Sequence, residues 1–198
     1  TTQLVSSTAL LAIGAAAGIG LYEGVGTATA TLAQPEGDMT QEQMMAEWEK
    51  MGQPGEHHKK LDRFTGEYDV QATFMMPDGG SIESGGSLTS EWVLGGRFVH
   101  GDFHLDNMMG PFDGISYVGY DNQTGEYVSI WLDSMSTKAY VHEARFEGDV
   151  FITEGEGATG PMRIVSTPKD DGSVVDEFYE KDPSGAWYRS GTMVYTRK

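Results

Sequence analysis

The pattern of apolar and polar positions divides the chain into three parts. From Leu4 to Tyr22 no residue is charged, so this stretch is apolar throughout. Between residues 40 and 52 apolar positions recur at helical spacing, and from Gly66 onward apolar and polar residues alternate. These patterns are typical of a membrane helix, an amphipathic helix and β-strands, respectively. We therefore expect a transmembrane helix at 1–24, a linker at 25–55 that includes a short amphipathic helix at 40–52, and a β-barrel domain at 56–198.

The alternating part predicts a series of short antiparallel strands. In the segment 87–94, for example, Leu88 and Trp92 share one face while Thr89 and Glu91 take the other. Turn-forming sequences rich in Gly, Asp, Asn and Pro separate successive segments. Strands without intervening helices predict an all-β fold, either a closed antiparallel barrel or a sandwich. The expected strands are 66–74, 87–94, 97–105, 114–121, 126–133, 137–146, 150–157, 162–168, 173–181 and 186–197.

The apolar segment near the start of the chain has two interpretations. Its uncharged residues would form a helix of roughly 28 Å at about 1.5 Å per residue, close to the hydrocarbon thickness of a bilayer. Gly14, Gly18, Gly20 and Gly24 form a stripe of small residues on which another membrane helix can pack. A cleavable leader is the alternative, because residues 27–33 resemble a signal-peptidase site. We favour an uncleaved single-pass anchor in a bacterial inner membrane, with the C-terminal domain in the periplasm.

The helix predicted at 40–52 has recognisable ends. Thr40 is placed to cap its N-terminus, Gln43 completes a capping box, and Gly52 and Pro54 end it. Its apolar face either packs on the chain's own barrel or contacts a partner protein or the membrane surface. The candidate partner-contact residues are Met44, Met45, Trp48 and Met51, on this face, and Met108 and Met109, in a loop flanked by Gly and Pro.

Composition and charge exclude several classes of function. The chain has 198 residues, enough for one ordinary folded domain and an appendage. Its 13 Lys and Arg stand against 30 Asp and Glu, a formal net charge of −17 that repels phosphate backbones. We therefore expect no nucleic-acid partner. The chain has no cysteine, which excludes disulfides, thiolate metal sites and a cysteine nucleophile.

Residue types that carry chemistry are present, but their spacing does not favour a reaction. His100, Asp102 and His104 alternate onto one face of a predicted strand, where two histidines four residues apart lie about 13 Å apart, too far to share one zinc ion. One of these histidines could join a site completed by His142 from another strand, but we expect these residues to lie on a solvated face instead. The segment 133–136 lacks the Gly-x-Ser-x-Gly elbow and the histidine partner of a hydrolase. We expect no catalytic residues, no cofactor and no metal.

Three stretches resemble a known bacterial family. They read GEHHKKLDRFTGEYDV at 55–70, EWVLGGRFVHGDF at 91–103 and MMGPFDGISYVGYDNQTGEYVSIWLDSM at 108–135. From about residue 56 to 197 the chain is similar to the family called domain of unknown function 1579. The resemblance implies a lipocalin-like β-barrel of about eight to ten strands, and it implies no activity. The motif positions are Trp92, Gly95, Gly96, Arg97, Tyr120, Asp121, Asn122, Trp131, Asp133, Ser134 and Met135.

Two functions from different classes fit these features. The first is a non-catalytic, membrane-anchored accessory subunit that braces a larger photosynthetic or respiratory membrane complex, with other subunits and the lipid bilayer as partners. The alternative is an exported carrier, with residues 1–33 removed, whose barrel holds a small apolar ligand such as a lipid, haem or pigment. Aromatic residues would then line the barrel mouth, unless they fill the core. These residues are Tyr68, Trp92, Phe98, Tyr120, Trp131, Tyr140 and Trp187.

Overall fold

The computed structural model describes residues 39–76, 79–107 and 110–198. The predicted membrane helix at 1–24, with its four glycines, and the loop residues Met108 and Met109 lie outside the described residues. Among the helices that are described, none combines the length and the hydropathy that a membrane crossing needs.

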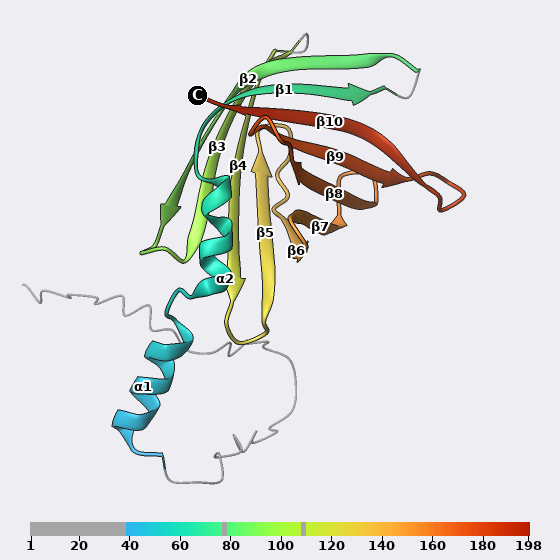
Figure 1. Cartoon of the computed structure of the whole chain (residues 1–198). Coiled ribbons are helices and arrows are strands. Elements are labelled where there is room, and N and C mark those ends of the chain that lie inside the picture. Colours follow the sequence, from blue (N-terminus) through green and yellow to red (C-terminus); the bar gives the residue numbers. More distant parts are fainter. Residues whose placement is uncertain (1–38, 77–78, 108–109) are drawn as a thin grey trace, which may run out of the picture. The chain divides into compact units, whose positions relative to one another are not determined.

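Ten antiparallel strands of the described chain close into a barrel (Figure 1). Successive strands pair with each other, and β1 pairs with β10 over Tyr68↔Arg197 to Phe74↔Gly191, which leaves no free sheet edge. The all-β, antiparallel prediction is confirmed, and the closure makes the fold a barrel and not a sandwich. The strands are β1 Gly66–Met75, β2 Ser81–Val93, β3 Phe98–Asn107, β4 Gly110–Asp121, β5 Glu126–Asp133, β6 Tyr140–Glu147, β7 Val150–Glu156, β8 Pro161–Pro168, β9 Val174–Lys181 and β10 Trp187–Arg197.

Strict alternation places the apolar side chains inside the barrel. In β1, Tyr68, Val70 and Ala72 are buried, while the residues between them are exposed.

The second strand begins at Ser81, six residues before the predicted start, because its glycines belong to the sheet and not to a turn. A side chain at Gly86 would clash with the backbone carbonyl of His104 on β3, so this close approach of the two strands requires glycine.

The first helix, α1 Gln41–Met51, has the predicted N-terminal cap. The N–H of Gln43 donates to Thr40 Oγ1 (3.2 Å), and the N–H of Thr40 donates to Gln43 Oε1 (2.9 Å). None of its residues is buried, and Met44, Met45, Trp48 and Met51 are all exposed. The structure therefore differs from the interpretation in which this face packs on the chain's own barrel. Asn122 Nδ2 donates to the carbonyls of Met51 and Gln53, both at 2.8 Å, and ties the end of α1 to the β4–β5 turn.

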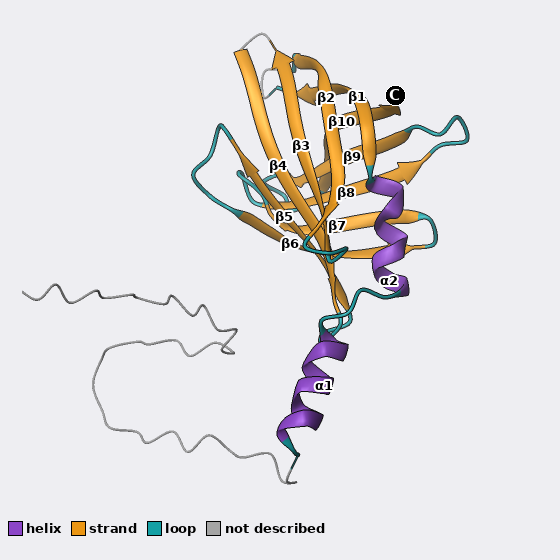
Figure 2. Ribbon diagram, turned by 90° about the vertical axis from the view of Figure 1, so that its left-hand side faces the viewer, coloured by secondary structure: helices purple, strands orange, loops and turns teal. Residues whose placement is uncertain are grey.

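A second helical segment, α2 Glu56–Lys59 followed by the 3₁₀ helix η1 Lys60–Phe64, covers one end of the barrel (Figure 2). Leu61 is fully buried among inward-facing side chains of four strands. The Trp92 indole N–H donates to Asp62 Oδ1 at 2.7 Å, and the His57 ring stacks on Tyr120 with a centroid distance of 4.2 Å. The partners packed around Leu61 are Val99, Tyr127, Ala144 and Phe151. This end of the barrel is closed by a packed core.

Candidate ligand-binding site

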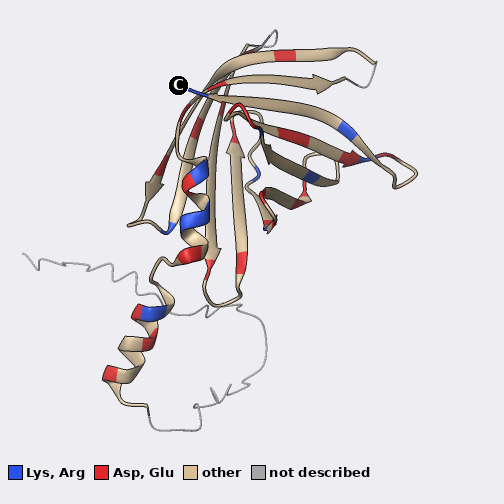
Figure 3. Ribbon diagram, in the orientation of Figure 1, with Lys and Arg blue, Asp and Glu red and all other residues tan. Residues whose placement is uncertain are grey.

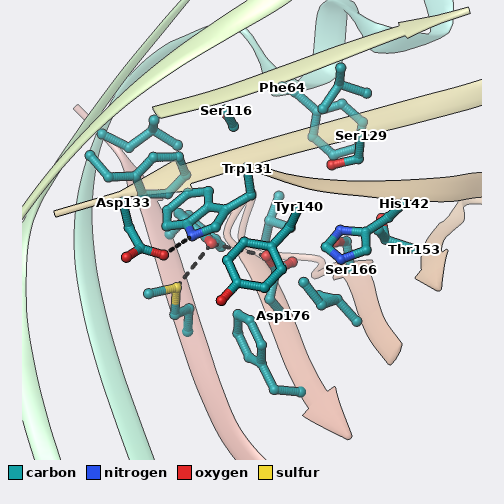
Figure 4. A pocket seen from close by; sticks show the side chains of 18 of the residues that line it. Phe64, Ser116, Ser129, Trp131, Asp133, Tyr140, His142, Thr153, Ser166 and Asp176 are labelled. Carbon is teal, nitrogen blue, oxygen red and sulfur yellow. Dashed lines mark hydrogen bonds between the residues drawn. The ribbon is translucent and has the colours of Figure 1, made fainter. Parts of the chain in front are cut away.

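The remainder of the barrel interior contains a second cluster of packed apolar side chains and a cavity beside them. The cavity has a volume of about 530 Å³, within the range of roughly 300–1,000 Å³ that small-molecule sites occupy. Its walls are formed by the inward-facing side chains, which are every second residue along each strand. Figure 4 shows many of them pointing into the same space. The larger apolar lining residues are Phe74, Leu88, Phe103, Leu105, Phe112, Trp131, Ile164, Val174, Phe178 and Met193.

The cavity reaches the surface at the end away from α2 and η1. Its lining includes Met135 and Ala158, which lie in the connections after β5 and after β7. Both connections are at the strand ends opposite to the one that Leu61 closes, because the strands run up and down in sequence. Met135 is 71% exposed, so this end of the cavity is its entrance.

One wall of the cavity is polar. Strands β5 to β9 contribute Ser129, His142, Thr153, Ser166 and Asp176 to the lining (Figure 4). The register places Ser129 opposite His142 and Ser166 opposite Asp176 on neighbouring strands. Polar groups that converge in an otherwise apolar pocket are the ones that orient a ligand.

Asp176 lies deep in this wall, where burial dominates its ionisation. Tyr195 donates its hydroxyl hydrogen to Asp176 Oδ2 at 2.9 Å. Burial raises the pKa of Asp176 above its ordinary value, although hydrogen bonds from Ser166 and Tyr195 act in the opposite direction. Burial, with the Asp176 charge next to it, holds the pKa of Tyr195 well above its ordinary value. Tyr195 is therefore a hydrogen-bond donor at any working pH.

His142 is the second titratable group of the polar wall. It is 4% exposed, and its Nε2 lies 3.3 Å from the carbonyl oxygen of Glu156. Burial lowers the pKa of His142, so the imidazole is neutral near pH 7. Gly155 makes room for the ring, because a Cβ there would lie 2.5 Å from His142 Cδ2.

Near the entrance, Asp133 holds the ring of Trp131 in place. The Trp131 indole N–H donates to Asp133 Oδ2 at 2.8 Å, and the other carboxylate oxygen accepts the backbone N–H of Met135 at 2.9 Å. The Trp131 ring also packs edge-on against Phe103, with a centroid distance of 5.0 Å. Trp131 is thus a rigid part of the apolar wall.

The aromatic residues predicted to line the barrel mouth have three different placements. Tyr68, Trp131 and Tyr140 line the cavity. Trp92 and Tyr120 instead pack in the core around Leu61. Phe98 covers Gly119 on a neighbouring strand, and Trp187 lies beside the charged groups of Arg163 and Lys181. Sequence reasoning considered His142 only as a metal ligand and did not single out Asp176. Both residues stand at inward positions of alternating strands, where a polar residue is the available signal.

The histidines considered for a metal site do not converge. His104 Nδ1 lies 2.8 Å from Asp113 Oδ1 in an exposed pair, and His100 Nε2 lies 3.5 Å from Asp102 Oδ1. His142 faces the barrel interior instead. Within the described ranges no three His, Asp or Glu side chains are grouped so that they could hold a metal ion.

Residues 53–197 match the family DUF1579, described as proteins of unknown function. The chain belongs to this family. No curated protein matches the chain. Among solved structures, the chain is similar to the one titled "Crystal Structure of Rv2717c from M. tuberculosis", with a TM-score of 0.54 and 13% identity over 74% of this chain and 99% of that one. At this identity the likeness shows the barrel fold alone.

The DUF1579 motifs lie at the two ends of the barrel. The Trp-x-Leu-Gly-Gly-Arg-Phe turn joins β2 to β3 beside η1, where Trp92 binds Asp62 and Arg97 Nη1 donates to the Leu94 carbonyl at 2.9 Å. The Trp-x-Asp-Ser-Met stretch lies at the entrance of the cavity, where Ser134 Oγ accepts the backbone N–H of Asp113 at 3.1 Å. One motif therefore braces the closed end and the other shapes the open end.

Proposed function

We propose that the barrel binds one small, mainly apolar molecule in its interior. The cavity of about 530 Å³ carries this proposal, because well-packed protein interiors leave few voids larger than a water molecule. Aromatic and aliphatic side chains would supply the burial energy, and the polar wall at His142 and Asp176 would orient the ligand. The function is that of a carrier of a small molecule, as in the second of the two functions expected from sequence, the exported carrier.

Isothermal titration calorimetry with 1-naphthylmethanol, a neutral probe that fits the cavity, tests this proposal. We expect one binding site per chain. Ser129→Phe places a ring in the cavity and should weaken binding by roughly tenfold or more. Thr89→Phe is the matched control, because residue 89 is on the exposed face of β2 and should leave the affinity unchanged. Binding that survives Ser129→Phe, or no heat at all, would contradict the proposal.

Native mass spectrometry of protein purified without added ligand is the complementary test. A stoichiometric mass increment that disappears in Ser129→Phe would identify the natural ligand directly, because only the cavity differs between the two proteins. An increment retained in the variant would place the bound molecule elsewhere.

A second candidate function is that of an accessory subunit of a photosynthetic or respiratory complex in a bacterial inner membrane, with the barrel in the periplasm. One observation favours it: the apolar face of α1, with Met44 and Trp48, is exposed. The predicted anchor at 1–24 lies outside the described residues, and this function stays a prediction. Detergent extraction of the native chain, followed by intact mass measurement and identification of co-eluting subunits, tests this function. The double variant Met44→Ser/Trp48→Ser should release the partner. A wild-type chain that elutes alone would contradict this function.

A further inference from the structure

Asp176 is the acidic group of the polar wall. It stands on β9 between the inward-facing Val174 and Phe178, opposite Ser166 on β8 and Met193 on β10. Its carboxylate faces the cavity together with these apolar neighbours (Figure 4). Any ligand that fills the cavity therefore meets this group.

The carboxylate of Asp176 has no basic partner in the described part of the chain. No Lys, Arg or His nitrogen lies within 4.0 Å of it. The cavity lining does include two basic side chains, but both are engaged elsewhere. Arg63 donates to the Asp149 carbonyl at 2.8 Å, and His142 lies against the Glu156 carbonyl.

A carboxylate in this position is costly for the folded protein. Removing an ionised group from water without a counter-charge destabilises the native state, and burial raises the pKa of Asp176 accordingly. The hydroxyls of Tyr195 and Ser166 donate hydrogen bonds to the carboxylate, but two neutral donors occupy only part of the acceptor capacity of its two oxygens and supply no counter-charge. A group that costs stability and faces a ligand cavity is a candidate for ligand recognition.

We propose that the ligand of the barrel is an apolar molecule with a protonated amine, and that this ammonium group binds the carboxylate of Asp176. This inference rests on the proposed function of the barrel as a ligand-binding site. An ammonium donor supplies the missing counter-charge at a short range and in apolar surroundings, where such a pair is strongest. The aromatic rings of Phe103 and Phe178 pack around the apolar body of the ligand.

The net charge of the chain agrees with a cationic ligand. On the open side, Asp133, Glu156 and Glu180 stand at strand ends, and the basic Lys138 and Lys181 lie at the same end. Figure 3 shows Asp and Glu on most strands, and the whole chain carries a formal net charge of −17. A net charge of this sign attracts cations to the protein and repels anionic ligands such as fatty acids.

Three probes with the same ring system separate the possibilities: 1-naphthylmethylamine, which is protonated at pH 7, neutral 1-naphthylmethanol, and anionic 1-naphthylacetate. Titration calorimetry with the wild-type chain should give a dissociation constant for the amine about tenfold or more below that of the alcohol. The acetate should bind weakest. An amine that binds no better than the alcohol would overturn the inference.

Asp176→Asn tests the assignment to this residue, because asparagine keeps the shape and can still accept the Tyr195 hydrogen bond. We expect the variant to lose the preference for the amine, so that the dissociation constants for the amine and the alcohol, which differ about tenfold or more in the wild type, become about equal. Asp106→Asn removes an equal charge from the exposed face of β3 and should leave the preference intact. An equal loss of preference in both variants would show a general charge effect and overturn the assignment.

The outcomes keep the two proposals apart. If none of the three probes binds the wild-type chain, the proposed ligand-binding function fails and the inference fails with it. If the alcohol binds and the amine has no advantage, the cavity is a binding site but Asp176 is not its cation-binding group. The comparison of probes on the wild-type chain depends on no variant, and thermal unfolding of Asp176→Asn checks that the variant is folded.

Discussion

The ring of Trp131 on β5 occupies the space in which residue 114 on β4 would have a side chain. Residue 114 is glycine, and a Cβ built there would clash with the six-membered ring of Trp131. The indole keeps this position through its hydrogen bond of 2.8 Å to Asp133. The shape of the cavity wall near the entrance therefore depends on the absence of a side chain on the neighbouring strand.

Gly114→Ala should displace Trp131 and reduce ligand binding. The added methyl group overlaps the ring, and overpacking of this kind costs about 1–3 kcal/mol of unfolding free energy. We expect a lower Tm, a shifted Trp emission spectrum and weaker binding of 1-naphthylmethanol. Gly55→Ala is the control, because a Cβ at Gly55 has nothing within 4 Å. Unchanged binding in Gly114→Ala would mean that Trp131 is not part of the binding wall.

Leu61→Ala should destabilise the barrel by loosening the segment that closes one end. Leu61 is fully buried among Val99, Tyr127 and Phe151, and truncation of such a residue costs about 2–5 kcal/mol. Urea unfolding should show this loss. Leu132→Ala, at a half-exposed position on β5, should cost less than about 1 kcal/mol. A small effect at Leu61 would show that η1 contributes little to the stability of the barrel.

Asp176→Asn should stabilise the ligand-free protein, increasingly so as the pH rises. The pKa of Asp176 is raised above its ordinary value of 3.8, so between these two values the native state binds more protons than the unfolded chain. The contribution of Asp176 to stability is therefore present below pH 3.8 and is lost as the pH rises through the raised pKa. We expect the difference in Tm between the variant and the wild type to grow across this window. Each kcal/mol by which the variant is the more stable protein should raise its Tm by about 2–4 °C. A Tm difference that is independent of pH would contradict a raised pKa of Asp176 in the folded protein.

His142→Gln should remove part of the acid sensitivity of the fold. Burial lowers the pKa of His142 below its ordinary value of 6.5, so between the lowered pKa and 6.5 the unfolded chain binds more protons than the native state. Stability then falls as the pH drops below 6.5, by at most about 1.4 kcal/mol per pH unit for one group. Urea unfolding at pH 7 and pH 5 should show a smaller loss in the variant. The buried His58, whose pKa is also lowered, is unchanged in both proteins.

Much of the fold follows from local patterns, but the start of β2 depends on a contact between two strands. Alternation of apolar and polar residues predicted the ten strands, and Thr40 with Gln43 predicted the start of α1. The early start of β2 was missed because the glycines around Gly86 resemble a turn in the sequence. Only the approach of the His104 carbonyl on β3 explains why a strand there requires glycine.

The candidate site was less predictable, because its members come from distant strands. Asp176, Tyr195 and His142 stand on β9, β10 and β6, and each is an ordinary inward position in its own strand. Nothing in the alternation says which inward positions meet, since that depends on the order and register of the strands. Trp92 and Trp131 illustrate the same point: both are inward-facing, yet one packs in the closed end and the other lines the cavity.

By itself, the sequence determined the approximate positions of the strands and which side chains share a face, because a two-residue period is a local property of the chain. Tertiary structure decided that β1 pairs with β10, that Leu61 fills one end and that a cavity of about 530 Å³ remains at the other. The reason is geometric: the space inside a closed sheet is set by its strand number and stagger, which determine whether inward-facing side chains can fill it.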